Sequence, residues 1–235
     1  MPIKNQKNKT IIAIDGPAGA GKTTISRLVA NHLGFTYIDT GAMYRAVALK
    51  AYENGIDTDD EKGLESICKK IKITFKTTKK ENRIFVNGKD WSEKIRQPFV
   101  GEITSRTSAK PRVREAMVKL QRRMGRNGKV VMEGRDIGTV VFPNARFKFY
   151  LDASPETRGK RRYLELIAKN EKALLQDIID EIKKRDKRDL SREHSPLKMA
   201  KDAVYIDTSN MTINDVVEKM LRVIKERLKF GSLCC

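Results

Sequence analysis

The chain has 235 residues, with 49 Lys and Arg against 30 Asp and Glu and a formal net charge of +19. This length can bury a hydrophobic core, and the three cysteines form neither an even disulfide framework nor a paired metal motif. No run approaches the ~18 uninterrupted apolar residues of a membrane-spanning helix, so we expect a soluble protein. The few cysteines favour a cytoplasmic location. The surplus of positive charge indicates an anionic partner or simple electrostatic repulsion between molecules.

The first part of the chain alternates strands and helices. Residues 1–9 are polar and basic without the apolar stretch of a secretory signal, and we expect a loose leader. A short apolar run predicts a buried strand at 10–15, and apolar residues at helical spacing predict a helix at 23–33. A second strand at 35–38 and a second helix at 41–54 follow. This order predicts a parallel sheet covered by helices.

The pattern changes at about residue 58. After an acidic helix start, the β-rich runs 71–75 and 83–86 and the turn dipeptide Asn87-Gly88 predict antiparallel hairpins. Such hairpins inside an α/β chain indicate an inserted lobe, which we expect to extend to about residue 107.

The rest of the chain returns to the α/β pattern. Strands are predicted at 130–132, 147–151 and 204–206, and helices at 111–124 and 212–228. Ser154, Pro155 and Glu156 predict the start of a further helix, with the serine as its N-cap. Residues 158–192 are highly charged with a thin apolar stripe, which favours a weakly packed, mobile lid; Gly159 within it is expected to loosen the lid helix by ~1 kcal/mol relative to alanine. The predicted segments are core 1–57, insert 58–107, core 108–156, lid 157–192 and core 193–235.

One motif predicts the chemistry. Residues 16–23, GPAGAGKT, match G-x-x-x-x-G-K-[ST] between a predicted strand and a predicted helix. Backbone N–H groups of such a loop bind phosphate, Lys22 is expected to reach the β- and γ-phosphates of ATP, and the Thr23 hydroxyl to bind Mg²⁺. The alternative is a glycine turn beside a surface lysine. The expected ATP-binding residues are Gly16, Pro17, Ala18, Gly19, Ala20, Gly21, Lys22, Thr23 and Thr24.

Arginines indicate a second phosphorylated substrate. The chain has no Asn-Lys-x-Asp guanine-recognition box, but it has dispersed arginines in predicted loops and in the lid. Arginine binds phosphate bidentately, and a clamp of this kind aligns two polyanions that repel each other. The arginines in question are Arg45, Arg135, Arg158, Arg161, Arg162, Arg185, Arg188 and Arg192.

Five blocks stand out in order along the chain: DGPAGAGKTT (15–24), YIDTGAMYR (37–45), PRVRE (111–115), EGRDIGTVVFP (133–143) and KRDKRDLSR (184–192). Together they resemble the bacterial cytidylate kinases over nearly the whole chain. The resemblance implies an α/β P-loop nucleoside monophosphate kinase fold with a five-stranded parallel core, an inserted antiparallel monophosphate-binding lobe and a short helical lid. It also implies phosphorylation of CMP and dCMP by ATP with Mg²⁺.

The resemblance assigns roles to individual positions. Thr40, Arg45, Arg135, Arg185 and Asp189 are similar to residues that hold the acceptor's phosphate and ribose. Ser105, Arg114, Asp136 and Arg192 are similar to those around the cytosine. Lys22, Arg135, Arg158, Arg162 and Arg185 are expected to stabilise the transferring phosphoryl group, and no catalytic base is required because the acceptor phosphate is already ionised.

Alternatives remain open from the residues alone. Asp136 and Asp189 could be structural ion-pair members, and Thr40 could only cap a helix. Since Thr40 stands where serine is common in the family, the preference between CMP and dCMP stays undecided. A kinase of another small acceptor, or a nucleic-acid-binding protein with a degenerate ATP site, are rival functions. We expect a monomer that binds no specific nucleic acid and no membrane.

Overall fold

A five-stranded sheet forms the centre of the protein. The computed structural model describes residues 10–78 and 81–230; the expected leader 1–9 and the Cys234-Cys235 end lie outside these ranges. The strands β1 (Ile11–Asp15), β2 (Thr36–Asp39), β6 (Val130–Gly134), β7 (Phe147–Asp152) and β8 (Val204–Asp207) run in the spatial order β2-β6-β1-β7-β8. All four neighbouring pairs are parallel, which confirms the predicted core sheet.

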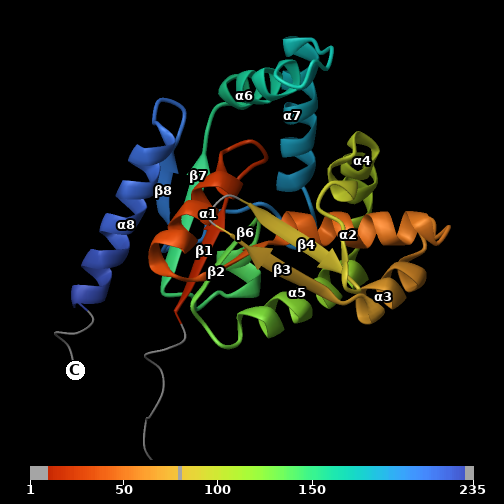
Figure 1. Ribbon diagram of the computed structural model, residues 1–235, viewed down its shortest axis with the longest axis horizontal. Helices are drawn as coiled ribbons and strands as arrows, with labels where there is room; N and C mark the ends of the chain where they lie inside the picture. Colours follow the sequence, from red (N-terminus) through yellow and green to blue (C-terminus); the bar gives the residue numbers. More distant parts are fainter. Residues whose placement is uncertain (1–9, 79–80, 231–235) are drawn as a thin grey trace, which may run out of the picture.

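Helices cover both faces of this sheet (Figure 1). The helices α1 (Lys22–Leu33) and α8 (Ile213–Phe230) pack against one face, where Ile12 and Ile14 of β1 join a buried cluster. The helices α2 (Thr40–Glu53) and α5 (Pro111–Gly125) cover the other face, where Ala13 belongs to a second cluster. Side chains of a strand alternate between faces, so a run buried on both faces reads as continuously apolar.

The insert contains the predicted hairpins. Its elements are α3 (Glu61–Lys70), β3 (Ile73–Thr77), β4 (Asn82–Val86), β5 (Lys89–Asp90), the short η1 (Lys94–Arg96) and α4 (Pro98–Thr107). Strands β3, β4 and β5 pair antiparallel. Asn87 and Gly88 turn between β4 and β5 with φ of 50° and 82°, as a two-residue hairpin requires. Helix α4 was not predicted, because Val100, Thr104 and Thr107 are its only buried residues.

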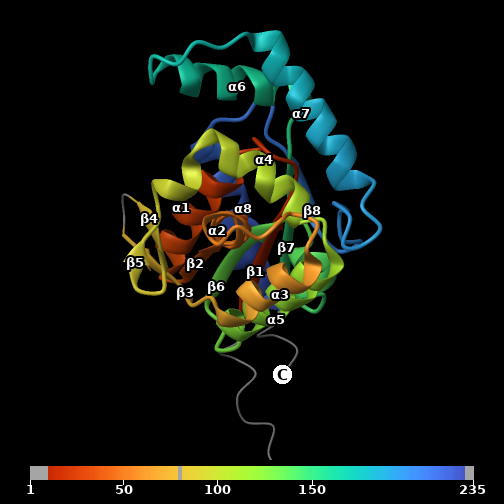
Figure 2. The same ribbon diagram turned by 90° about the vertical axis from the view of Figure 1, so that its right-hand side faces the viewer.

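The lid is a helical hairpin beyond the carboxyl end of β7 (Figure 2). Helix α6 (Pro155–Ile167) begins with the predicted cap, in which the Ser154 hydroxyl accepts a hydrogen bond from the Thr157 backbone N–H. Helix α7 (Leu175–Leu190) packs against α6. Gly159 corrects our expectation of a loosened helix: it is buried at this contact, and a Cβ there would lie 2.4 Å from Ile179 Cγ1. The missing side chain lets the two helices approach closely.

We predict that Gly159→Ala weakens the lid hairpin by about 1–3 kcal/mol, the usual cost of overpacking, although alanine favours helix. Hydrogen exchange of α6 and α7 amides should become faster in this variant. Gly101→Ala is the matched control, since a Cβ at Gly101 in α4 meets nothing within 4 Å. Unchanged exchange in α6 and α7 would contradict the packing role of Gly159.

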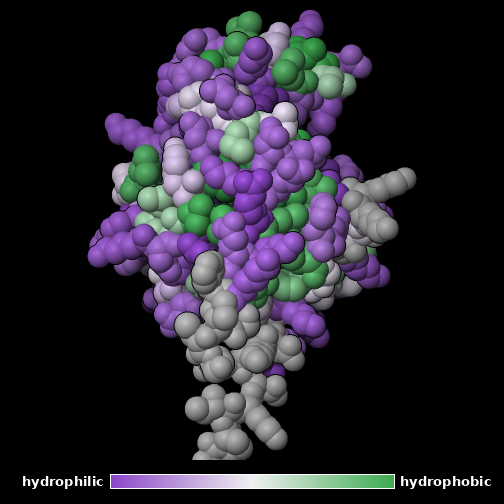
Figure 3. All heavy atoms as spheres, turned by 90° about the vertical axis from the view of Figure 1, so that its left-hand side faces the viewer, coloured by the Kyte–Doolittle hydropathy of each residue, from purple (hydrophilic) through white to green (hydrophobic). Residues whose placement is uncertain are grey.

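The surface reflects the high content of charged residues in the sequence. The face on the α8 side is largely hydrophilic, with apolar side chains in separate patches (Figure 3). Within the described ranges, none of the helices combines the length and apolar character needed to span a bilayer.

Candidate active site

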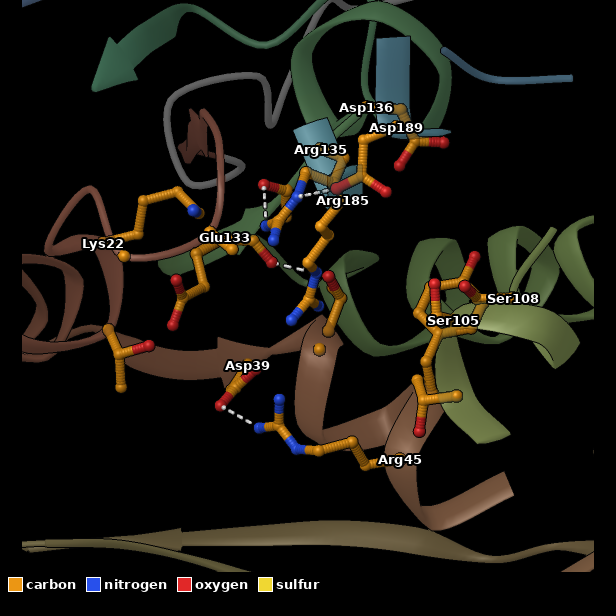
Figure 4. A pocket seen from close by; sticks show the side chains of 18 of the residues that line it. Lys22, Asp39, Arg45, Ser105, Ser108, Glu133, Arg135, Asp136, Arg185 and Asp189 are labelled. Carbon is orange, nitrogen blue, oxygen red and sulfur yellow. Dashed lines mark hydrogen bonds and ion pairs between the residues drawn. The ribbon is translucent and has the colours of Figure 1, made fainter. Parts of the chain in front are cut away.

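A cavity of about 260 Å³ lies at the carboxyl ends of β1, β2 and β6. It is enclosed by α4, α7 and the loop of the glycine motif, residues 16–23, which we call the P-loop. Open parallel sheets bind their ligands at the carboxyl ends of the strands. In Figure 4 Lys22 lies on one side of the cavity, Ser105 and Ser108 lie on the other, and Arg135 and Arg185 lie between them. The lining residues are Ala18, Gly19, Lys22, Thr23, Asp39, Thr40, Gly41, Tyr44, Arg45, Thr104, Ser105, Ser108, Arg114, Glu133, Gly134, Arg135, Asp136, Arg185, Asp189 and Arg192.

The P-loop connects β1 to α1 in the predicted strand-loop-helix context. Gly16 has φ 146°, and a Cβ there would lie 1.9 Å from the Leu151 carbonyl oxygen, so only glycine fits. Lys22 is the first residue of α1 and is buried, and its ammonium donates to the Pro17 carbonyl. Burial, followed by the positive charge of Arg135, lowers the pKa of Lys22. A polyphosphate anion in the cavity would reverse this shift by supplying a counter-charge.

Two carboxylates stand beside the P-loop at the ends of β2 and β6. Glu133 is buried and accepts a hydrogen bond from the Tyr37 hydroxyl, and burial raises the pKa of its carboxyl. The Asp39 carboxylate caps α2 by accepting from the Ala42 N–H at 2.8 Å. The cap of α2 is therefore Asp39, not Thr40. The Thr40 hydroxyl lines the cavity and donates to the Glu133 carbonyl at 2.6 Å.

An arginine cluster occupies the middle of the cavity. Asp189 is buried and accepts from Arg135 Nε at 3.0 Å and from Arg192 Nη2 at 2.5 Å. Burial, with the nearby charge of Arg135, lowers the pKa of Arg185 to about 10. Arg45 pairs with Asp39 at 3.3 Å. So many converging guanidinium groups repel one another, and a bound phosphate would neutralise them.

The wall of the cavity also contains a buried ion pair. Arg114 Nη2 lies 2.5 Å from Asp136 Oδ2, and both side chains are about 5% exposed. Arg114 also donates to the Ser108 carbonyl at 3.1 Å, and its guanidinium lies 5.4 Å from the centre of the Tyr44 ring. Asp136 and Asp189 both form ion pairs and both line the cavity. A structural role in an ion pair is therefore compatible with a role in binding a ligand.

Some polar atoms of this wall have no protein partner. Among the described side chains of this wall, Arg45 Nε and Arg114 Nε are buried without a hydrogen bond. Buried polar atoms are rarely left unsatisfied.

Arg158 and Arg162 are predicted site residues that do not line the cavity. Arg158 is buried at the root of α6, where it donates to the Ala153 and Ala18 carbonyls at 2.8 Å and 3.0 Å and pairs with Asp186 of α7 at 2.5 Å. It connects the lid to the P-loop in this structure. Arg162 is half-exposed on α6 and pairs with Glu165. Their catalytic roles stay predictions.

Sequence reasoning assigned no role to several lining residues, namely Asp39, Tyr44, Thr104, Ser108 and Glu133. Asp39 and Glu133 are the residues that a topological rule could have found, since each lies at the carboxyl end of a strand in a parallel sheet. Thr104 and Ser108 lie on or next to α4, the helix that the pattern did not predict.

Known families and proteins resemble this chain along nearly its full length. The family model described as Cytidylate kinase matches residues 12–226. The "Cytidylate kinase" of Geobacter sp. (strain M21) is 51% identical over 226 residues, which cover 96% of this chain and 97% of the relative. That of Thermosipho melanesiensis is 46% identical, covering 93% of this chain and 98% of the relative.

A solved structure supports the fold. Shikimate kinase from Bacteroides thetaiotaomicron has a TM-score of 0.50 at 14% identity, covering 92% of this chain and 98% of that chain. This likeness confirms the P-loop kinase fold expected from the sequence. With the family model matching residues 12–226 and relatives near half identity along almost the full length, the chain belongs to the cytidylate kinase family.

Proposed function

We propose that this protein transfers a phosphoryl group from ATP to CMP and dCMP in pyrimidine nucleotide metabolism. The observation that carries the proposal is a single cavity lined by both the P-loop lysine and the buried Arg114–Asp136 pair. Family membership supports the same reaction. Lys22 suits a polyphosphate, and the Arg114–Asp136 pair suits a base with an amino group.

Base selection follows from hydrogen-bonding chemistry. Cytosine has an amino donor at C4 and acceptors at N3 and O2, which match a carboxylate beside an arginine. Uracil has a carbonyl oxygen at C4, which would face the Asp136 carboxylate. An unsatisfied buried acceptor costs about 1–3 kcal/mol, so CMP is favoured over UMP.

Transfer between two phosphates requires alignment and charge stabilisation rather than a base. Lys22 is assigned to the phosphates of ATP, and Arg45, Arg135 and Arg185 to the acceptor phosphate. The lid residues Arg158 and Arg162 are assigned to the phosphoryl group that is transferred. Arg162 can reach this group only if the lid closes. Water exclusion by this closure prevents hydrolysis of ATP.

The residues present also fit Mg²⁺. Within residues 10–78 and 81–230 no cluster of three or more His, Cys, Asp or Glu side chains could hold a metal by itself. Mg²⁺ needs only one or two carboxylates together with substrate phosphates and water. The Thr23 hydroxyl, with the buried Glu133 carboxylate beside it, would hold the ion, which neutralises charge on the β- and γ-phosphates.

The residues assigned to the ribose already have partners within the protein. The Thr40 hydroxyl already donates to the Glu133 carbonyl, so it keeps only acceptor capacity for a ribose. Asp189 is engaged by two arginines. We therefore assign both CMP and dCMP as substrates. We also propose a cytoplasmic monomer as the working form, because the proposed chemistry requires no second subunit.

A coupled ADP-release assay tests this function. ATP with Mg²⁺ is offered with CMP, dCMP, UMP, AMP and GMP in turn, and turnover should be fastest with CMP and dCMP. A chelator should stop it. Equal rates with all five acceptors would refute the assignment. Binding of single-stranded RNA at physiological salt, with no CMP turnover, would favour the rival nucleic-acid function.

A further inference from the structure

A buried carboxylate that does not line the cavity connects the P-loop to the turn that follows Asp136. Asp15 is the last residue of β1 and is 4% exposed. Its Oδ1 accepts a hydrogen bond from the Ile137 N–H at 2.8 Å, and its Oδ2 accepts one from the Gly138 N–H at 2.7 Å. These donors begin the π-type turn η2 (Ile137–Val141), which follows Asp136 directly.

The contacts of Asp15 connect two segments that are far apart in the sequence. Asp15 immediately precedes Gly16 of the P-loop, and it pairs in register with Gly134, two residues before Asp136. The carboxylate therefore spans from the phosphate-binding loop to the turn that carries Arg135 and Asp136. The other end of η2 is held from α5, where Arg122 donates to the Val140 and Val141 carbonyls at 2.7 Å and 2.9 Å.

Burying an ionised carboxylate costs free energy because the charge loses its hydration. Burial raises the pKa of Asp15 to about 7, and the two backbone N–H donors and Lys22 oppose that rise. A neutral residue of similar size would avoid the desolvation. What the carboxylate provides is two acceptor oxygens, one for each N–H group.

We propose that Asp15 is a positioning residue that holds the η2 turn, and with it the base-reading carboxylate of Asp136, in register with the P-loop. This inference rests on the proposed function and concerns the same site. Asp15 itself lies outside the cavity wall. Its effect reaches the base through the backbone of residues 136–138 and the Arg114–Asp136 pair.

Asp15→Asn tests the proposal with little change in shape. The amide oxygen keeps one N–H partner, while the amide NH₂ faces the other N–H group, so the turn must shift. We expect KM for CMP to rise about tenfold and the CMP to UMP ratio of kcat/KM to fall by a similar factor, the scale of one unsatisfied buried hydrogen bond. KM for ATP should change much less.

Two further variants complete the experiment. Asp60→Asn is the matched control, because Asp60 also accepts a backbone N–H, from Gly63 at 2.9 Å, but it caps α3 outside the cavity. It should leave the CMP to UMP ratio unchanged. Arg122→Ala releases the other end of η2 from a more exposed position, and it should lower the same ratio even if Asp15→Asn fails to fold.

The outcomes separate the two claims. A wild-type enzyme without CMP turnover refutes the proposed function. An active wild type whose Asp15→Asn variant keeps the CMP to UMP ratio, or loses ATP and CMP affinity equally, refutes the positioning role alone. Should Asp15→Asn not fold, an unchanged ratio in Arg122→Ala refutes it.

Discussion

Replacing Lys22 with alanine is expected to lower kcat for phosphoryl transfer from ATP to CMP by about 10³-fold or more. Lys22 is buried at the start of α1, with its ammonium held at the P-loop by the Pro17 carbonyl. Its charge stabilises the phosphates most where negative charge develops during transfer, and a preorganised group in a site shielded from water acts strongly there. The coupled ADP-release assay measures the loss.

The fold should survive this substitution. Neutral alanine removes the desolvation cost of a buried ammonium and the repulsion from Arg135, the two main causes that lower the pKa of Lys22. The thermal unfolding midpoint should stay close to that of the wild type. Lys69→Ala is the control, because Lys69 is exposed and pairs with Glu65 within α3, away from the cavity wall. Turnover within tenfold of the wild type in a folded Lys22→Ala variant would rule out the assigned role.

Asp136→Ala should mainly relax the choice of base. Without the carboxylate, the cytosine amino group loses its acceptor and the uracil carbonyl loses a repulsive neighbour. A change of about 1–3 kcal/mol corresponds to a fall of about 5- to 150-fold in the CMP to UMP ratio of kcat/KM. Steady-state kinetics with both acceptors measures this ratio.

Asp136→Ala also leaves Arg114 unpaired in a buried site, and breaking such a pair costs about 3–5 kcal/mol of stability. Asp136→Asn keeps an acceptor oxygen for Arg114 and separates folding from recognition. Asp59→Ala, which removes an exposed ion pair with Lys110, controls for loss of a surface carboxylate. An unchanged CMP to UMP ratio in folded Asp136 variants would falsify the base-reading role.

Local patterns predicted most of the elements, because their causes are local. The strand before Gly16, the P-loop and the helix after it were predicted from an apolar run, a glycine motif and helical spacing, and they occur as β1, the loop and α1. The same is true of the Ser154 cap and the Asn87-Gly88 turn. In each case residues within a few positions of one another satisfy the backbone. The segment boundaries, from 1–57 to 193–235, remain predictions.

The assignment of the arginines shows where local reasoning ends. Residue type and the family resemblance pointed to Arg45, Arg135 and Arg185, and all three line one cavity although they come from three distant segments. The expected loop position was wrong for Arg45, which lies in α2, and Arg185 lies in α7. The same reasoning could not separate them from Arg158. Only the packing of α6 against the P-loop and α7 decides that its donors meet the Ala153 and Ala18 carbonyls and Asp186.

The sequence by itself determined the phosphate-binding loop, the parallel α/β core and the family, since a contiguous motif and ordered blocks carry that information. Only the tertiary structure decided that Gly159 serves a helix contact with Ile179, and that Asp15 holds the turn at Ile137 and Gly138. The physical reason is sequence separation. Asp15 and Ile137 lie 122 residues apart, and their contact exists only because β1 and β6 are neighbours in the sheet.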